Sequence, residues 1–272
     1  MSNAPEGFRG KLCNAIERSR SFLCVGLDPD PARFPDVVRG DVGAFLREVV
    51  SATQDLVCAY KPNIAFYEAL GERGWRVLKD TVEAIPDSIP VILDAKRGDI
   101  GNTAKMYAKA YFKDLGVDAV TVNPYMGFDT IEPFLRYGAA FVLCITTNPS
   151  AGDFQFLQAE GKPLYLWVAE RAVEWARSGE VGLVTGATRP ETIRKVREVA
   201  PCLPLLIPGV GAQKGDLEAS VREGLDGEGR GVIVNVSRAV LYASSGPDFA
   251  EAARRVAMGF VERMRKVEIR EI

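Results

Sequence analysis

Short apolar runs of six to eight residues alternate along the chain with longer amphipathic stretches. Eight such runs occupy residues 22–28, 56–63, 90–96, 118–124, 141–147, 181–186, 204–210 and 231–237. Between them Leu, Val and Phe recur at three- and four-residue spacing, as in residues 42–56 and 130–137, which predicts helices. Near-continuous apolar strands that alternate with helices are typical of a parallel sheet covered on both faces. Eight such units in about 250 residues predict one (β/α)8 barrel domain over residues 1–272, rather than an open doubly wound sheet.

Three segments carry boundary signals. Residues 188–191 (Thr-Arg-Pro-Glu) have the spacing of a capping box with proline in the first turn, which predicts a helix start. Residues 249–266 have the pattern of a closing amphipathic helix. Residues 211–230 are polar and rich in glycine, which predicts a mobile loop on the phosphate side of the barrel. A plain surface insertion is the alternative for this last segment.

The composition excludes several kinds of chemistry. The chain has 272 residues, a formal net charge of -2 and no histidine, so Ser-His-Asp and Cys-His nucleophiles and His-ligated zinc are excluded. The five cysteines form no Cys-x-x-Cys pair, and Cys24, Cys58 and Cys144 lie inside apolar runs as small buried hydrophobes do. The near-neutral charge gives no reason to expect nucleic acid or a membrane as partner. Without a membrane-length apolar run or a signal-peptide core, we expect a cytoplasmic protein.

Polar residues gather at the carboxyl ends of the apolar runs, the edge that carries the active site in such barrels. They are Asp28, Lys61, Asn63, Asp94, Lys96, Asn123, Thr147 and Arg238. The densest group is Asp94-Ala95-Lys96-Arg97-Gly98-Asp99, where strand alternation turns Asp94 and Lys96 to the same side. Two lysines among three aspartates are costly to bury without a function. A structural ion-pair network and a snorkelling Lys61 are the alternatives.

The seventh and eighth runs contain a candidate phosphate site. The seventh leads into Pro208-Gly209-Val210-Gly211-Ala212-Gln213, and the eighth ends in Ser237-Arg238. Loops after strands 7 and 8 of such barrels commonly hold phosphate through backbone N–H groups and a short helix N-terminus. Glycine permits close approach of the backbone, and Arg238 is a forked donor for phosphate oxygens. The glycines form no dinucleotide fingerprint, because Gly215 falls one position too late.

Together these motifs resemble the orotidine 5′-phosphate decarboxylase family, and most closely its longer bacterial subgroup, from Gly26 to about Ala243. The motifs are Gly26-Leu27-Asp28, Lys61-Pro62-Asn63, residues 94–100 with Thr103, Asn123-Pro124-Tyr125, Thr147-Asn148-Pro149, Gly186-Ala187-Thr188, residues 208–213 and Ser237-Arg238. The resemblance implies that orotidine 5′-phosphate is converted to uridine 5′-phosphate in de novo pyrimidine biosynthesis. It also implies a cytoplasmic homodimer that uses neither a metal nor a cofactor.

The resemblance further implies a role for each motif residue. Lys96 protonates C6 of the pyrimidine as carbon dioxide leaves, and Lys61, Asp94 and Asp99 complete an alternating charged array. Asp28 and Lys61 contact the ribose. Asp99 and Thr103 reach into the site of the neighbouring subunit, which makes the dimer obligate. The remaining substrate contacts are expected at Asn123, at Thr147 where many relatives have serine, at Pro208 and Gly211, and, on the 5′-phosphate, at Gln213 and Arg238.

Three other functions use parts of the same pattern. A keto-sugar-phosphate decarboxylase or a hexulose-phosphate synthase has the same strand motif but holds Mg²⁺ with additional carboxylates, whereas the second run here ends in Lys61. A Schiff-base aldolase needs an uncharged lysine, whereas Asp94 and Asp99 flank Lys96. A non-catalytic barrel that senses nucleotides would bind phosphate but would not need the charged array.

Overall fold

The computed structural model describes residues 7–38, 40–211 and 215–267. Within them one parallel sheet contains β1 (Leu23–Leu27), β2 (Ala59–Pro62), β3 (Ile92–Arg97), β4 (Ala119–Val122), β5 (Ala139–Ile145), β8 (Val181–Thr185), β9 (Leu205–Pro208) and β10 (Val232–Val236). The order of neighbours is β2-β1-β10-β9-β8-β5-β4-β3. Bridges from Tyr60 to Val91 and from Asn63 to Asp94 join β2 to β3 and close the barrel. The predicted (β/α)8 architecture is confirmed.

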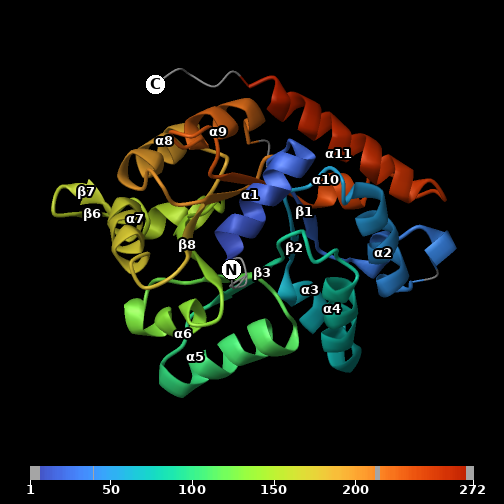
Figure 1. The fold of residues 1–272 in the computed structure, drawn as a ribbon, viewed down its shortest axis with the longest axis horizontal. Coiled ribbons are helices and arrows are strands. Elements are labelled where there is room, and N and C mark those ends of the chain that lie inside the picture. The colour runs from blue at the N-terminus through green and yellow to red at the C-terminus, as the bar shows by residue number, and fades with distance from the viewer. Residues whose placement is uncertain (1–6, 39, 212–214, 268–272) are drawn as a thin grey trace, which may run out of the picture.

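Helices ring the barrel when it is viewed from the end that α1 covers (Figure 1). The α-helices are α1 (Phe8–Ser19), α2 (Val42–Thr53), α3 (Ile64–Glu68), α4 (Gly74–Glu83), α5 (Gly101–Ala108), α6 (Glu132–Leu135), α7 (Leu164–Trp175), α8 (Pro190–Val199), α9 (Leu217–Gly224), α10 (Arg238–Leu241) and α11 (Phe249–Arg265). A small hairpin of β6 (Gln158–Ala159) and β7 (Lys162–Pro163) lies between β5 and α7. None of the helices in the described ranges is both long and apolar enough for a membrane span.

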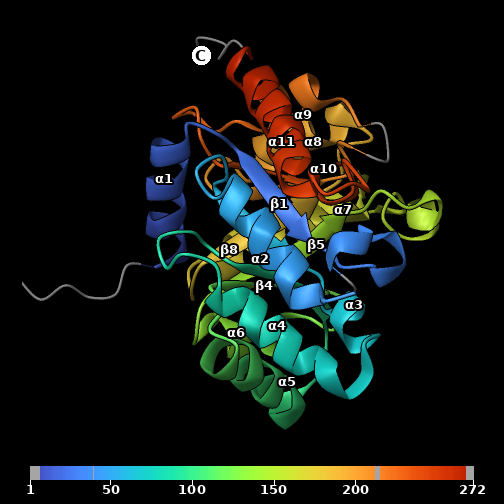
Figure 2. The same ribbon diagram turned by 90° about the vertical axis from the view of Figure 1, so that its right-hand side faces the viewer.

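Helix α1 closes the end of the barrel where the strands begin (Figure 2). Its Phe8 and Leu12 pack with Ile92, Phe141 and other side chains that point into the barrel. The rings of Phe8 and Phe141 meet edge to face, with centroids 5.4 Å apart. Because α1 covers the amino end, the carboxyl end is left as the place where a ligand can enter.

Alternation along the strands divides the core into two layers. In β3, Ile92 packs inside the barrel, whereas Leu93 packs with the surrounding helices, as the pattern predicts. The thiols of Cys24, Cys58 and Cys144 are buried, also as predicted. Burial raises the pKa of the Cys24 thiol to about 12, so this cysteine stays protonated and behaves as a small apolar side chain.

Two boundary predictions need correction. Helix α8 does begin at Pro190, but its N-cap is Arg189 and no side chain caps it, so the capping box at Thr188 is not formed. Residues 211–230 are not a continuous loop, because α9 occupies Leu217–Gly224. The Asp216 side chain accepts a hydrogen bond from the Ala219 backbone N–H and starts this helix. Leu217 and Val221 are buried at helical spacing, a signal that the glycine content obscured.

Candidate active site

A cavity of about 250 Å³ opens at the carboxyl end of the barrel. Residues on, or directly after, all eight strands of the barrel sheet form its wall. Eight of the residues that were expected to have a catalytic or substrate-binding role line it: Asp28, Lys61, Asp94, Lys96, Thr147, Pro208, Gly211 and Arg238. Asn63, Gly209 and Ser237, which belong to the predicted motifs, line it too. The barrel therefore brings together, at one mouth, most of the polar residues that end the apolar runs.

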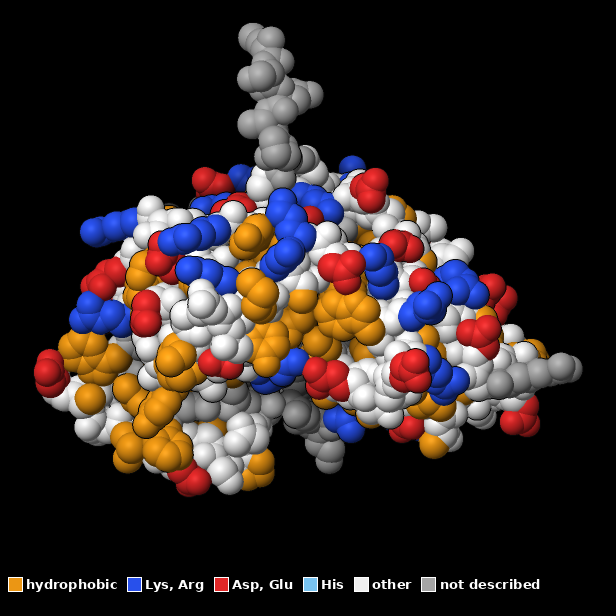
Figure 3. All heavy atoms as spheres, turned by 90° about the horizontal axis from the view of Figure 1, so that it is seen from below, with side chains coloured by type: hydrophobic (Ala, Val, Ile, Leu, Met, Phe, Trp, Pro, Cys, Tyr) orange, Lys and Arg blue, Asp and Glu red, His pale blue; other side chains and the backbone are white. Residues whose placement is uncertain are grey.

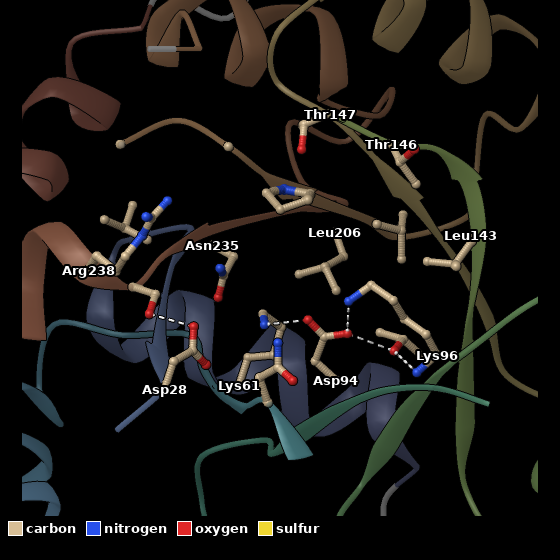
Figure 4. Close-up of a pocket in the computed structure, with 18 of the residues that line it drawn as sticks. Asp28, Lys61, Asp94, Lys96, Leu143, Thr146, Thr147, Leu206, Asn235 and Arg238 are labelled. Carbon is tan, nitrogen blue, oxygen red and sulfur yellow. Dashed lines mark hydrogen bonds and ion pairs between the residues drawn. The ribbon is translucent and has the colours of Figure 1, made fainter. Parts of the chain in front are cut away.

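Four charged side chains form a row across this cavity in the order Asp28, Lys61, Asp94, Lys96 (Figure 4). Lys61 Nζ lies 2.8 Å from Asp94 Oδ2. Lys96 Nζ lies 2.6 Å from the other oxygen, Asp94 Oδ1. Negative and positive groups thus alternate, and Asp94 bridges the two lysines.

The side chains in the middle of the row, Lys61 and Asp94, are largely buried, whereas the Lys96 end of the row is exposed. Lys61 is 3% exposed; burial alone would lower the pKa of its ammonium, but Asp94 and Asp28 raise that pKa above its ordinary value. Burial alone would raise the pKa of Asp94, but Lys61 and Lys96 hold it well below its ordinary value. Both groups are therefore charged at neutral pH. The Lys96 side chain is 49% exposed, which makes it the cation that a bound molecule can reach.

The Asp28 end of the row depends on close packing between β1 and the end of β10. Ser237 Oγ donates a hydrogen bond of 2.6 Å to Asp28 Oδ2. This contact needs glycine at position 26, because a Cβ there would lie 2.6 Å from the Ser237 Cβ. The other oxygen, Asp28 Oδ1, is buried and has no hydrogen-bond partner among the described residues. Asp28 can therefore accept one more hydrogen bond.

The side of the cavity where the sequence predicts a phosphate site is formed by the ends of β9 and β10. Arg238 is the first residue of α10, and within the described ranges no carboxylate pairs with its exposed guanidinium. Gly209 has φ +99°, a conformation that favours glycine, and its carbonyl accepts a hydrogen bond of 3.0 Å from Gly215 N–H. Gly209 and Arg238 line the same cavity, and a guanidinium without a carboxylate partner among the described residues is suited to bind an anion. Gln213 lies outside the described residues.

Three predicted site residues lie outside the cavity wall of this single chain. Asn123 is exposed, and its side chain accepts a hydrogen bond from Tyr125 N–H. Asp99 Oδ1 accepts a hydrogen bond from Ile100 N–H, and Thr103 is exposed on α5. Four large hydrophobic side chains are exposed close to them in the sequence: Ile100, Met106, Tyr125 and Met126. Figure 3 shows the molecule from the side of α5 and α6, where hydrophobic side chains lie among charged ones.

Comparisons with known proteins identify the family of this chain. The family model described as Orotidine 5′-phosphate decarboxylase / HUMPS family matches residues 21–256. This chain belongs to that family. It is 53% identical over 260 residues to an orotidine 5′-phosphate decarboxylase from Ralstonia pickettii, covering 92% of this chain and 95% of the relative. The Herpetosiphon aurantiacus decarboxylase is 52% identical over 261 residues, covering 93% of this chain and 96% of the relative.

A solved structure extends the similarity to three dimensions. The Leishmania donovani OMP decarboxylase superposes with a TM-score of 0.85 at 40% identity, covering 96% of this chain and 98% of that chain. The orotidine 5′-phosphate decarboxylase / HUMPS family therefore accounts for nearly the whole barrel, and the matching segment contains every predicted site residue.

Several residues that line the cavity were not predicted from the sequence. Thr121 and Asn235 line it from inside β4 and β10, and the apolar part of the wall comes from Leu143, Val184 and Leu206. Thr121 and Asn235 are polar residues within apolar runs, which is the signal that could have revealed them. The apolar lining residues carry no such signal, because nothing distinguishes them from core residues in the sequence.

Within the described ranges, no three or more acidic or cysteine side chains lie together in a way that could hold a metal ion. At the end of β2, where a carboxylate ligand would be useful, the side chain is that of Lys61. The residues present thus suit an anionic ligand better than a divalent cation.

Proposed function

We propose that this chain decarboxylates orotidine 5′-phosphate to uridine 5′-phosphate in the cytoplasm, without a metal or a cofactor. The observation that supports this most is the Lys96 ammonium, which is half-exposed to the cavity and fixed on one side by Asp94. Arg238 lies at the opposite end of the charged row (Figure 4). A molecule with a phosphate at one end and a reacting carbon at the other fits between these two cations.

The chemistry requires a fixed positive charge beside C6. When carbon dioxide leaves C6, the bond's electron pair stays in the plane of the pyrimidine ring, where the π system cannot delocalise it. A Lys96 ammonium at that point stabilises the developing carbanion and then transfers its proton to C6. The 2.6 Å ion pair with Asp94 holds the Lys96 ammonium in place at the cavity. The product is uridine 5′-phosphate, and the neutral Lys96 amine recovers a proton from solvent.

The other polar groups orient the nucleotide. Asp28, with one carboxylate oxygen unpaired among the described residues, is suited to accept a hydrogen bond from a ribose hydroxyl. In the described part of the chain no group bonds to the Thr147 hydroxyl, which faces the cavity and is suited to contact the pyrimidine. Arg238 and Gln213 are assigned to the 5′-phosphate, and Pro208 and Gly211 to further substrate contacts. Binding energy from the phosphate, far from C6, then contributes to the rate.

The active unit that we propose is a homodimer in which Asp99 and Thr103 complete the neighbouring site. Both residues lie outside their own cavity wall, beside the exposed apolar side chains of Ile100 and Met106. Association through this surface would bury those side chains and bring a further carboxylate to the charged row. Asn123, on the same exposed edge, would gain its contact in the same way.

Complementation between two inactive variants tests the shared site. Lys96→Ala and Asp99→Ala are each expected to be inactive alone. Mixed dimers would contain one site with both residues intact, so random exchange of subunits should restore about a quarter of the wild-type activity. Mixing two batches of the same variant is the control. A monomer by sedimentation, or no recovery despite exchange, contradicts the shared site.

The function itself is tested by following the ultraviolet absorbance of orotidine 5′-phosphate with and without EDTA. We expect loss of the orotate chromophore at a rate that the chelator does not change. Lys96→Ala should lower kcat by a thousand-fold or more, on the order of the loss of a main electrostatic stabiliser. Lys195→Ala, an exposed lysine on α8, is the matched control and should keep wild-type kcat.

Arg238→Ala should act differently, because its guanidinium is assigned to the phosphate. We expect KM to rise about 10-fold or more, with a smaller change in kcat. No turnover by the folded wild-type protein would refute the proposal. Mg²⁺-dependent turnover of a sugar phosphate would instead identify a keto-sugar-phosphate decarboxylase or a hexulose-phosphate synthase.

A further inference from the structure

Strand β3 departs from regular pairing at the point where the catalytic array begins. Leu93 pairs with Val120 and Arg97 pairs with Val122, so β3 advances four residues while β4 advances two. The bulge contains Asp94, Ala95 and Lys96. Lys96 has φ +48°, in the left-handed region that non-glycine residues rarely occupy. Such strain persists only where the surroundings hold the backbone in place.

The side chain of Thr121, opposite the bulge on β4, replaces the missing backbone partner. Its Oγ1 accepts hydrogen bonds from Ala95 N–H at 3.0 Å and from Lys96 N–H at 2.9 Å. The same hydroxyl donates to Asp94 Oδ1 at 3.0 Å. Thr121 is 1% exposed, and its one donor and two acceptor positions are all used.

We propose that Thr121 is a positioning residue, which holds the Asp94 carboxylate and the strained Lys96 backbone in the geometry that proton transfer requires. Asp94 Oδ1 receives both the Thr121 hydroxyl and the Lys96 ammonium, whereas Lys61 occupies Oδ2. Removal of the hydroxyl would leave two backbone N–H groups without an acceptor and would free the carboxylate to rotate. The Lys96 ammonium would then lose its fixed position relative to C6. This inference rests on the proposed decarboxylase function.

Two substitutions separate the hydroxyl from the shape of the side chain. Thr121→Val keeps the branched shape without the hydroxyl, and it should lower kcat about 10-fold or more, because small displacements of a catalytic group are costly. The KM for orotidine 5′-phosphate and the Kd for uridine 5′-phosphate should change less than about threefold, since the phosphate and ribose contacts remain. Thr121→Ser keeps the hydroxyl and should stay within about threefold of wild-type kcat.

Thr185→Val is the matched control. Thr185 is also a fully buried strand threonine, but it does not line the cavity and its hydroxyl has no partner among the described residues. Its kcat should equal that of wild type. Amide hydrogen exchange supplies a readout independent of turnover: in Thr121→Val the amides of Ala95 and Lys96 should exchange faster, while that of Ile92 should not.

The outcomes distinguish this inference from the proposed function. Wild-type kcat in Thr121→Val, or equal losses in the Val and Ser variants, would overturn the positioning role. Unchanged exchange at Ala95 and Lys96 would also overturn it. An inactive wild-type protein in which those amides still become exposed on substitution would refute the decarboxylase function alone. If Thr121→Val does not fold, Thr121→Ala takes its place, and Thr121→Ser must then exceed it about 10-fold in kcat.

Discussion

The two ends of the barrel both hold charged groups away from water, but they satisfy those charges in different ways. At the amino end, the Arg197 guanidinium donates six hydrogen bonds to backbone carbonyls. The acceptors are the carbonyls of Ala200, Pro201, Leu203, Gly224 and Gly231. Burial lowers the pKa of Arg197 to about 10, and it still remains charged at neutral pH.

At the carboxyl end, charged side chains pair mainly with each other and leave groups available. Lys96 is half-exposed, and one oxygen of Asp28 has no partner within the described part of the chain. The difference separates a charge that is satisfied entirely by the backbone from a row of charges with groups available to a ligand. Arg197 ties the chain together and has little capacity left for a ligand, whereas the row at the mouth keeps donors and acceptors that face a cavity.

Asp94→Asn should have the largest effect of these substitutions. It removes the carboxylate that bridges Lys61 and Lys96, so both the stability of the protein and its turnover should fall. It leaves the buried Lys61 with a weaker counter-charge, so the free energy of unfolding at pH 7 should fall by about 3 kcal/mol. Turnover should fall at least about 100-fold, since Lys96 also loses its anchor. Urea unfolding and the absorbance assay measure the two effects. Full stability in this variant would mean that the ion pairs at the mouth are not structural.

The difference in unfolding free energy between wild type and Asp94→Asn should depend on pH, and the pKa shift of Asp94 fixes the direction. The folded pKa of Asp94 is lowered from the ordinary value of 3.8, so its contribution is present above that value and is lost as pH falls toward the folded pKa. The gap in unfolding free energy between wild type and Asp94→Asn should therefore be constant from pH 5 to 8 and should shrink below about pH 4. A gap that widens in acid would contradict the assignment.

Arg197→Met should show the opposite pattern, a loss of stability without a loss of catalysis. Several buried carbonyls lose their donor, and we expect the free energy of unfolding to fall by about 3 kcal/mol. Thermal unfolding measures this loss, and kcat/KM of the folded protein should stay within about twofold of wild type. Arg194→Met, exposed on the same helix α8, is the control. A fall in kcat without a loss of stability would show that Arg197, at the amino end, affects catalysis at the carboxyl end.

Glu180→Ala should have the smallest effect and tests how α1 is held. Glu180 accepts hydrogen bonds from Phe8 N–H at 2.7 Å and Arg9 N–H at 2.9 Å, which caps α1 from a distant part of the chain. Loss of such a cap lowers the free energy of unfolding by about 1 kcal/mol. Amide exchange in α1 should rise while activity is unchanged. Glu174→Ala, in an exposed ion pair on α7, should change stability by less than about 0.5 kcal/mol.

Much of this protein follows from patterns that are local in the sequence. Runs of apolar residues at strand length, separated by helical periodicity, are sufficient to predict the barrel, because each element must bury one face. Parallel strands in a barrel end at the same rim. Lys61, Asp94 and Lys96 could therefore be assigned to one site from their positions at the ends of runs. The helix within residues 211–230 also has a local signal, the four-residue spacing of the apolar residues Leu217 and Val221. The glycines around that segment favoured the prediction of a loop instead.

The contacts that arrange those side chains depend on the three-dimensional fold. The bulge that sets Lys96 at φ +48° depends on Thr121, 25 residues away, and the cap of α1 depends on Glu180, 172 residues from Phe8. Nothing in the neighbouring sequence indicates that a threonine in an apolar run holds a bulge, or that a glutamate before a strand caps a distant helix. These hydrogen bonds exist only because barrel closure brings distant segments within about 3 Å, where the direction of a donor decides the partner.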